Sequence, residues 1–97
     1  MCTRQECFDR LHQATPYIMN EYGVTSMRVF GSMARGDNHP GSDVDVFVEM
    51  PPKMFKIIGL KQYLEDLLGI AVDLVRKHNN LSQFFLSRVE RDGVSIF

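Results

Sequence analysis

The chain has 97 residues, 44% hydrophobic and 24% charged, which is the composition of a globular domain and not of a disordered, collagenous or coiled-coil chain. Eleven Lys and Arg against twelve Asp and Glu leave a net charge of -1, so there is no basic excess to drive non-specific nucleic-acid binding. No stretch approaches the roughly 18 apolar residues of a membrane span, and the start lacks the apolar core of a signal peptide. We therefore expect a single cytoplasmic domain over residues 1–97.

The first predicted element is an amphipathic helix over residues 4–22. Apolar residues recur there at helical spacing, and Gly23 follows as a stop signal. Pro16 lies inside the helix, where proline removes a backbone hydrogen bond and clashes with the preceding turn. We therefore expect a kink or a break just before it.

Two strands follow with different patterns. Residues 27–30 form a short apolar run that ends at Gly31 and Ser32, which predicts a buried strand leading into a tight turn. Residues 42–49 alternate strictly between three valines on one side and mostly acidic residues on the other. This alternation predicts a strand that buries its valine face in the core.

The remaining elements complete a layered fold. Residues 57–68 carry apolar side chains at helical spacing and are followed by Gly69, which predicts a helix that ends there. Residues 70–75 are rich in β-branched side chains, which predicts a third strand. Residues 81–89 are predicted to be helical, and residues 94–97 a short closing strand after a turn. The order of elements indicates an α/β (α+β) fold in which helices flank a small mixed β-sheet.

Two features of the central segment point to phosphate chemistry. Gly31 and Ser32 follow a strand and open a short helical turn, an arrangement that presents backbone N–H groups and a hydroxyl to a phosphate. Asp43 and Asp45 project from one face of a strand with Cα atoms about 6.6 Å apart, so both carboxylates can share a metal ion. By itself, however, such a pair is also typical of a solvated strand face.

Asp73 favours the metal site over the solvated face. It lies in the middle of the apolar run 70–75, where burying a charge without a partner is costly. If this strand lies beside the strand of Asp43 and Asp45, the three carboxylates share one face. Hard oxygen ligands of this kind suit Mg²⁺ or Mn²⁺ bound together with substrate phosphates.

The motif resembles that of a known family. The run GSMARG, a five-residue gap and SDVD, followed by a third Asp in a later apolar strand, is similar to the minimal nucleotidyltransferases of the DNA polymerase beta superfamily. Every fixed position of the pattern GSxARG…SDxD is filled, and the resemblance spans nearly the whole chain. It implies a polymerase-beta-like nucleotidyltransferase fold.

The resemblance also implies roles for individual residues. Asp43 and Asp45 would bind both catalytic metal ions, and Asp73 would complete the metal site and help to activate the attacking hydroxyl. With ATP as the substrate, four residues would bind the nucleotide: Gly31, Ser32, Arg35 and Ser42. Within this group Arg35 would either lie near the phosphates or brace the loop.

Members of this size often act as the antitoxin partner of a helical HEPN protein and are implicated in transferring AMP from ATP to a tyrosine of that toxin. The resemblance therefore implies a HEPN-type partner and protein adenylylation. The length agrees, because 97 residues leave no room for an acceptor-binding domain, so we expect another chain to supply the acceptor. Two alternatives stay open. One is a non-catalytic module that binds nucleotide or partner, and the other is nucleotidyl transfer to RNA or to a small molecule.

Overall fold

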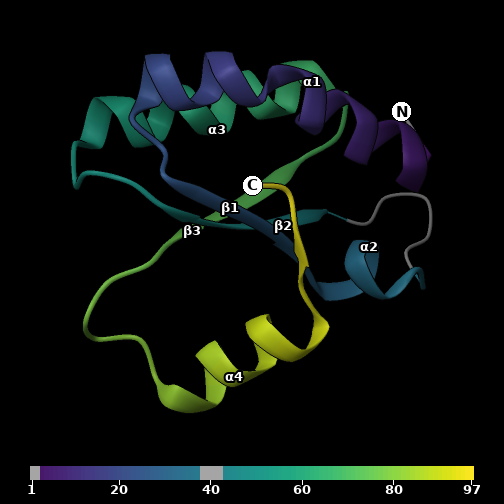
Figure 1. Cartoon of the computed structure of the whole chain (residues 1–97), viewed down its shortest axis with the longest axis vertical. Helices are drawn as coiled ribbons and strands as arrows, with labels where there is room; N and C mark the ends of the chain where they lie inside the picture. Colours follow the sequence, from purple (N-terminus) through teal and green to yellow (C-terminus); the bar gives the residue numbers. More distant parts are fainter. Residues whose placement is uncertain (1–2, 38–42) are drawn as a thin grey trace.

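In the computed structural model, which describes residues 3–37 and 43–97, helices cover a four-stranded mixed sheet (Figure 1). The elements are α1 (Arg4–Tyr22), β1 (Ser26–Phe30), α2 (Gly31–Arg35), β2 (Val44–Glu49), α3 (Met54–Leu68), β3 (Val72–Arg76), α4 (Gln83–Asp92) and β4 (Val94–Ser95). The strand order is β3-β2-β1-β4, in which β2 is parallel to β3 and β1 is antiparallel to both β2 and β4. The predicted fold class and order of elements are confirmed.

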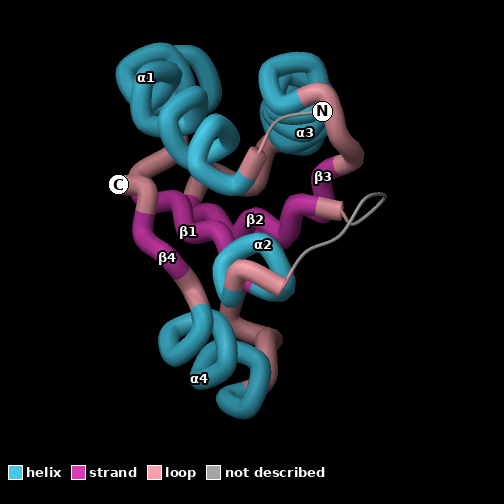
Figure 2. Tube along the Cα trace, turned by 90° about the vertical axis from the view of Figure 1, so that its right-hand side faces the viewer, coloured by secondary structure: helices cyan, strands magenta, loops and turns pink. Residues whose placement is uncertain are grey.

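The two faces of the sheet carry different layers. Helices α1 and α3 lie side by side on one face, whereas α4 lies on the other and α2 sits where β1 ends (Figure 2). The core fills the space between the sheet and the α1/α3 layer, where fully buried side chains include Leu11, Ile18, Leu60, Leu64, Val44, Val46 and Val48. The predicted valine face of β2 is therefore confirmed.

Helix α1 runs without interruption through Pro16, so the break that the sequence led us to consider does not occur. Pro16 is exposed, whereas Ala14 and Ile18 on either side of it are buried in the core. Packing of those neighbours offsets the one hydrogen bond that proline cannot make. The predicted stop at Gly23 is confirmed, because its φ of 70° is left-handed and its N–H donates to the Met19 carbonyl at 3.1 Å.

Two helices extend beyond their predicted bounds. Helix α3 begins at Met54, three residues early, because Met54 and Phe55 are 69% and 90% exposed and so add nothing to the apolar periodicity. Helix α4 begins after Ser82, whose Oγ accepts from the Phe85 N–H at 3.1 Å, and it continues to Asp92. Across the part of the chain that the structure describes, no helix combines the length and apolarity needed to span a membrane.

Candidate active site

The predicted phosphate turn lies at the junction of β1 and α2. Gly31 opens α2 with a φ of +74°, a backbone conformation that residues with a Cβ rarely adopt. A Cβ at this position would strike the Asp45 carboxylate, whose Cγ would be 3.1 Å away. Both the backbone angle and the closeness of Asp45 therefore require glycine here.

Arg4 holds α2 in place from a distance of about thirty residues in the sequence. Its Nε donates to the Met33 carbonyl at 2.9 Å and its Nη2 donates to the Ala34 carbonyl at 3.0 Å. The guanidinium lies over the Phe8 ring at 4.7 Å, which restricts its orientation. Sequence reasoning missed Arg4, because a single arginine at the start of a helix carries no signal of such a contact.

The sheet register brings two of the predicted carboxylates together. Asp45 on β2 pairs with Asp73 on the parallel strand β3, so both side chains leave the same face of neighbouring strands. The expected adjacency of these strands is confirmed. Asp73 is exposed, however, and not buried as the apolar run suggested. The physical reason is that β3 is an edge strand, whereas α4 packs against β1 and α2.

The third predicted carboxylate, Asp43, is exposed just before β2 begins. Within residues 3–37 and 43–97, no three His, Cys, Asp or Glu side chains are gathered so that they could hold a metal ion as they stand. The structure therefore pairs Asp45 with Asp73 by register but does not draw the three carboxylates into one coordination group. Ser42, the fourth predicted nucleotide-binding residue, lies outside the described residues.

The charge of Asp45 is disfavoured in this environment. Burial raises the pKa of the Asp45 carboxyl, and the negative charges of Asp73 and Asp43 raise it further. The positive charge of Arg35 acts in the opposite direction. The predicted repulsion between neighbouring carboxylates is thus present at Asp45, and a cation at this place would relieve it.

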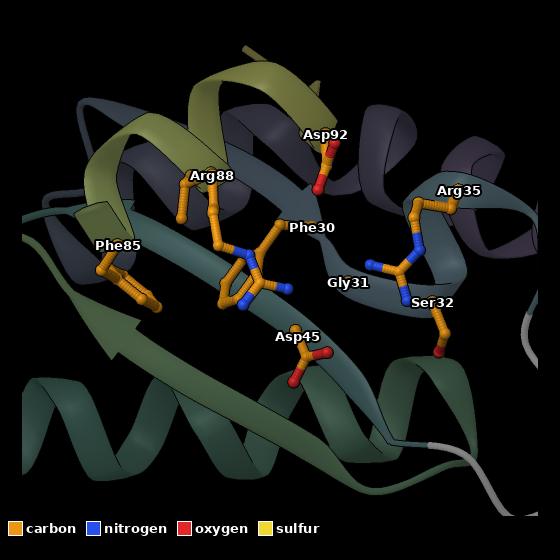
Figure 3. Close-up of a pocket in the computed structure, with 9 residues that line it drawn as sticks. Phe30, Gly31, Ser32, Arg35, Asp45, Phe85, Arg88 and Asp92 are labelled. Atoms are coloured by element: carbon orange, nitrogen blue, oxygen red, sulfur yellow. The ribbon is translucent and has the colours of Figure 1, made fainter.

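Asp45 and the turn open into a pocket of about 360 Å³ between the sheet and α4 (Figure 3). Its lining residues are Phe30, Gly31, Ser32, Arg35, Asp45, Phe85, Arg88, Val89 and Asp92. Four predicted site residues are among them, whereas Asp43 and Asp73 are not. The four residues from α4 were not predicted, because no motif marks them and only packing of that helix on the sheet brings them here. The edge-to-face contact of Phe30 and Phe85, with ring centroids 5.7 Å apart, fixes that packing.

Comparison with known proteins identifies the family. Residues 16–96 match the family model of the nucleotidyltransferase domain. The chain is 40% identical over 79 residues to the protein adenylyltransferase MntA of Thermococcus cleftensis, which covers 79% of this chain and 80% of that protein. This chain belongs to the nucleotidyltransferase domain family, and it is a nucleotidyltransferase.

Two solved structures share its fold. A chain from the crystal structure of a toxin-antitoxin with AMP-PNP superposes with a TM-score of 0.70 at 22% identity, over 89% of this chain and 72% of that one. A chain from the structure of a tri-AMPylated Shewanella oneidensis HEPN toxin in complex with MNT antitoxin gives a TM-score of 0.64 at 18% identity, over 93% and 71%. The expected fold, in which helices flank a small mixed sheet, is therefore shared with both structures.

Proposed function

We propose that this protein transfers AMP from ATP to a tyrosine hydroxyl of a partner protein in a Mg²⁺-dependent reaction. One observation carries the proposal, namely that the glycine turn at Gly31 directly faces the Asp45 carboxylate inside a single pocket. A backbone that can approach a phosphate and a carboxylate that can hold a cation therefore share one cavity. The relative named as a protein adenylyltransferase and the structural neighbour with AMP-PNP support this assignment.

The donor set fits a divalent cation. Asp45 and Asp73 are register partners on neighbouring parallel strands, and Asp43 lies two residues before Asp45. Burial and the charges of Asp73 and Asp43 raise the pKa of Asp45, and a cation would relieve this cost. We assign Mg²⁺ to these three residues. When bound, it would neutralise phosphate charge and polarise the α-phosphate.

The protein's own residues account for binding and proton transfer. Backbone N–H groups at Gly31 and the hydroxyl of Ser32 would hold the triphosphate, with Arg35 beside it. The acceptor oxygen attacks the α-phosphorus, the bond to the bridging oxygen breaks, and pyrophosphate leaves. Asp73, exposed beside Asp45, would take the proton of the attacking hydroxyl.

The exposure of the carboxylates supports an acceptor on another protein. Asp43 and Asp73 face solvent, and in-line attack needs the acceptor held in position with water kept out. A second chain would supply both conditions. We propose a helical HEPN-type protein as this partner, in a toxin–antitoxin pair, and the structural neighbour that pairs an AMPylated HEPN toxin with MNT antitoxin supports it.

The proposal is tested by incubating the purified protein with ATP, Mg²⁺ and a purified helical HEPN-type protein. We expect the partner to gain one or more AMP masses in intact mass spectrometry. Asp73→Asn should stop the gain without dissociating the complex, whereas Asp66→Asn, which changes an exposed carboxylate of α3, should not affect it.

Each alternative gives a different result in the same experiment. An unmodified partner in a stable complex that binds ATP would indicate a non-catalytic binding module. If label from ATP appeared on RNA or on a small molecule and none on the partner, that molecule and not a protein would be the acceptor of the nucleotide. Full activity in the presence of a metal chelator would remove the Mg²⁺ assignment.

A further inference from the structure

Within residues 3–37 and 43–97, Arg88 on α4 forms no ion pair with a carboxylate. Of the other charged residues in the pocket wall, Arg35 forms an ion pair with Asp37 at 3.2 Å and Asp92 forms one with Arg91 at 3.3 Å, whereas Asp45 forms none within the described residues. Among the described residues, the Arg88 guanidinium makes no hydrogen bond, and its carbon lies 6.0 Å from the centre of the exposed Phe84 ring. Its five N–H donors are thus available to a ligand.

The position of Arg88 places its positive charge at the pocket. Arg88 and Asp45 line the same pocket from different elements, α4 and β2 (Figure 3). In the close-up, the Arg88 side chain leaves the helix and extends into the space between Phe30 and Asp45. Phe30, Phe85 and Val89 form the apolar part of the wall, so Arg88 is the positive charge that α4 contributes to this pocket.

We propose that Arg88 binds the β- and γ-phosphates of the nucleotide, an inference that rests on the proposed function. The reacting α-phosphorus must lie beside Asp45, so the distal phosphates are the part of the nucleotide that can extend across the pocket toward α4. A guanidinium pairs with two phosphate oxygens at once, which orients as well as attracts them. During transfer the same contact would hold the charge that develops on departing pyrophosphate.

The test measures binding by calorimetry with Mg²⁺ for three probes: ATP, inorganic tripolyphosphate and AMP. Arg88→Ala should weaken binding of ATP and of tripolyphosphate by a similar factor, about 10- to 100-fold, and leave AMP within about twofold. Arg88→Lys should recover part of the loss, because lysine keeps the charge but lacks the planar fork. Lys53→Ala is the matched control, since it removes one exposed positive charge outside the pocket.

The outcomes separate this inference from the one on which it rests. Wild-type protein that binds neither ATP nor tripolyphosphate would overturn both. Wild-type binding with an unchanged Arg88→Ala variant would overturn the role of Arg88 alone. An equal loss for AMP and ATP would also overturn it, because Arg88 would then contact the base or the α-phosphate. An equal loss of ATP affinity in Lys53→Ala would mean that the effect of Arg88→Ala comes from the total positive charge of the protein and not from a contact with the phosphates.

Discussion

The two faces of the sheet differ although the same strands build both. On the α1/α3 face, Val44, Val46 and Val48 are fully buried, and the helices cover the strands completely enough to form a continuous core. On the α4 face, the neighbours of those valines in β2 are Asp45, which is half-buried, and Phe47, which touches Phe85 of α4 with ring centroids 6.1 Å apart. One face is closed and apolar, and the other is partly open and charged.

This difference shows how a small chain can separate stability from chemistry. Side chains alternate along a strand, so one residue can pack in the core while the next holds a charge at a pocket. The closed face can then supply most of the buried apolar surface, which leaves the open face free to carry unfavourable charge. Changes on the two faces should therefore affect different properties.

The largest expected effect is on the open face. Asp45→Asn should reduce nucleotide transfer by about 100-fold or more, because it removes a carboxylate assigned to the metal and the phosphates. The variant should fold, and its metal-free form should be no less stable than wild type, since the repulsion from Asp73 and Asp43 is relieved. Steady-state transfer assays and thermal melts measure the two quantities.

Glu49→Gln is the matched control, because it neutralises a carboxylate on the same face of the same strand, outside the pocket. It should retain transfer activity. Wild-type transfer activity in Asp45→Asn would show that the Asp45 carboxylate has no role in the reaction.

On the closed face, Leu64→Ala should lower the free energy of unfolding by about 2–5 kcal/mol, because Leu64 is fully buried and its loss leaves a cavity. Leu86→Ala on α4 should lower it by about 1 kcal/mol, since that side chain is only half-buried. Urea denaturation of both variants measures the difference. A larger loss in Leu86→Ala would mean that α4, and not the α1/α3 layer, carries the stability.

Two glycines with similar backbone angles separate strain from function. Gly31 has a φ of +74° and Gly36 a φ of +84°, so the backbone angle alone should make alanine cost about 1–2 kcal/mol of stability at either position. Only at Gly31 does the added Cβ strike Asp45, whereas at Gly36 the Arg4 Nε, the nearest atom from outside that turn, would be 3.9 Å away. We expect Gly31→Ala to weaken ATP binding about tenfold or more and Gly36→Ala to change it about twofold or less. Equal ATP affinities in calorimetry would make the Gly31 turn purely structural.

The smallest expected effect concerns pH, and it has opposite signs on the two faces. Because the pKa of Asp45 is raised, the metal-free folded state binds the carboxyl proton of Asp45 more tightly than the unfolded chain does. The contribution of Asp45 to stability is therefore lost as pH rises from the ordinary carboxyl range through the pKa of the folded state. The pKa of Glu65 is lowered by the Val72 N–H, which donates to it at 2.9 Å, and by Lys61. Its contribution is present above the ordinary carboxyl range and is lost as pH falls through the folded pKa.

Denaturation midpoints of Asp45→Asn and Glu65→Gln across acidic pH measure these contributions. Relative to wild type, stability should rise more steeply with pH in Asp45→Asn and less steeply in Glu65→Gln. Slopes that change in the same direction would contradict the contrast between the two faces.

Local pattern was sufficient for much of the fold and for one side of the pocket. Alternation predicted β2 and its buried valines, and Gly23 and Gly69 predicted helix ends that adopt left-handed conformations. The motif predicted Gly31, Ser32, Arg35 and Asp45, all of which line the pocket. The helices, the strands and the position of the glycine turn were predictable because they depend on residues a few positions apart.

The sequence by itself thus determined the order of the elements, four residues that line the pocket and the family, since each depends on short-range spacing. Only the tertiary structure decided that α1 continues through Pro16, that Asp73 is exposed at an edge strand, and that Arg4 donates to the carbonyls of α2. It also decided that α4 supplies the wall of the pocket with Arg88. The physical reason is that these features arise from packing between segments distant in the chain, whose side chains carry no local mark of the neighbours they will meet.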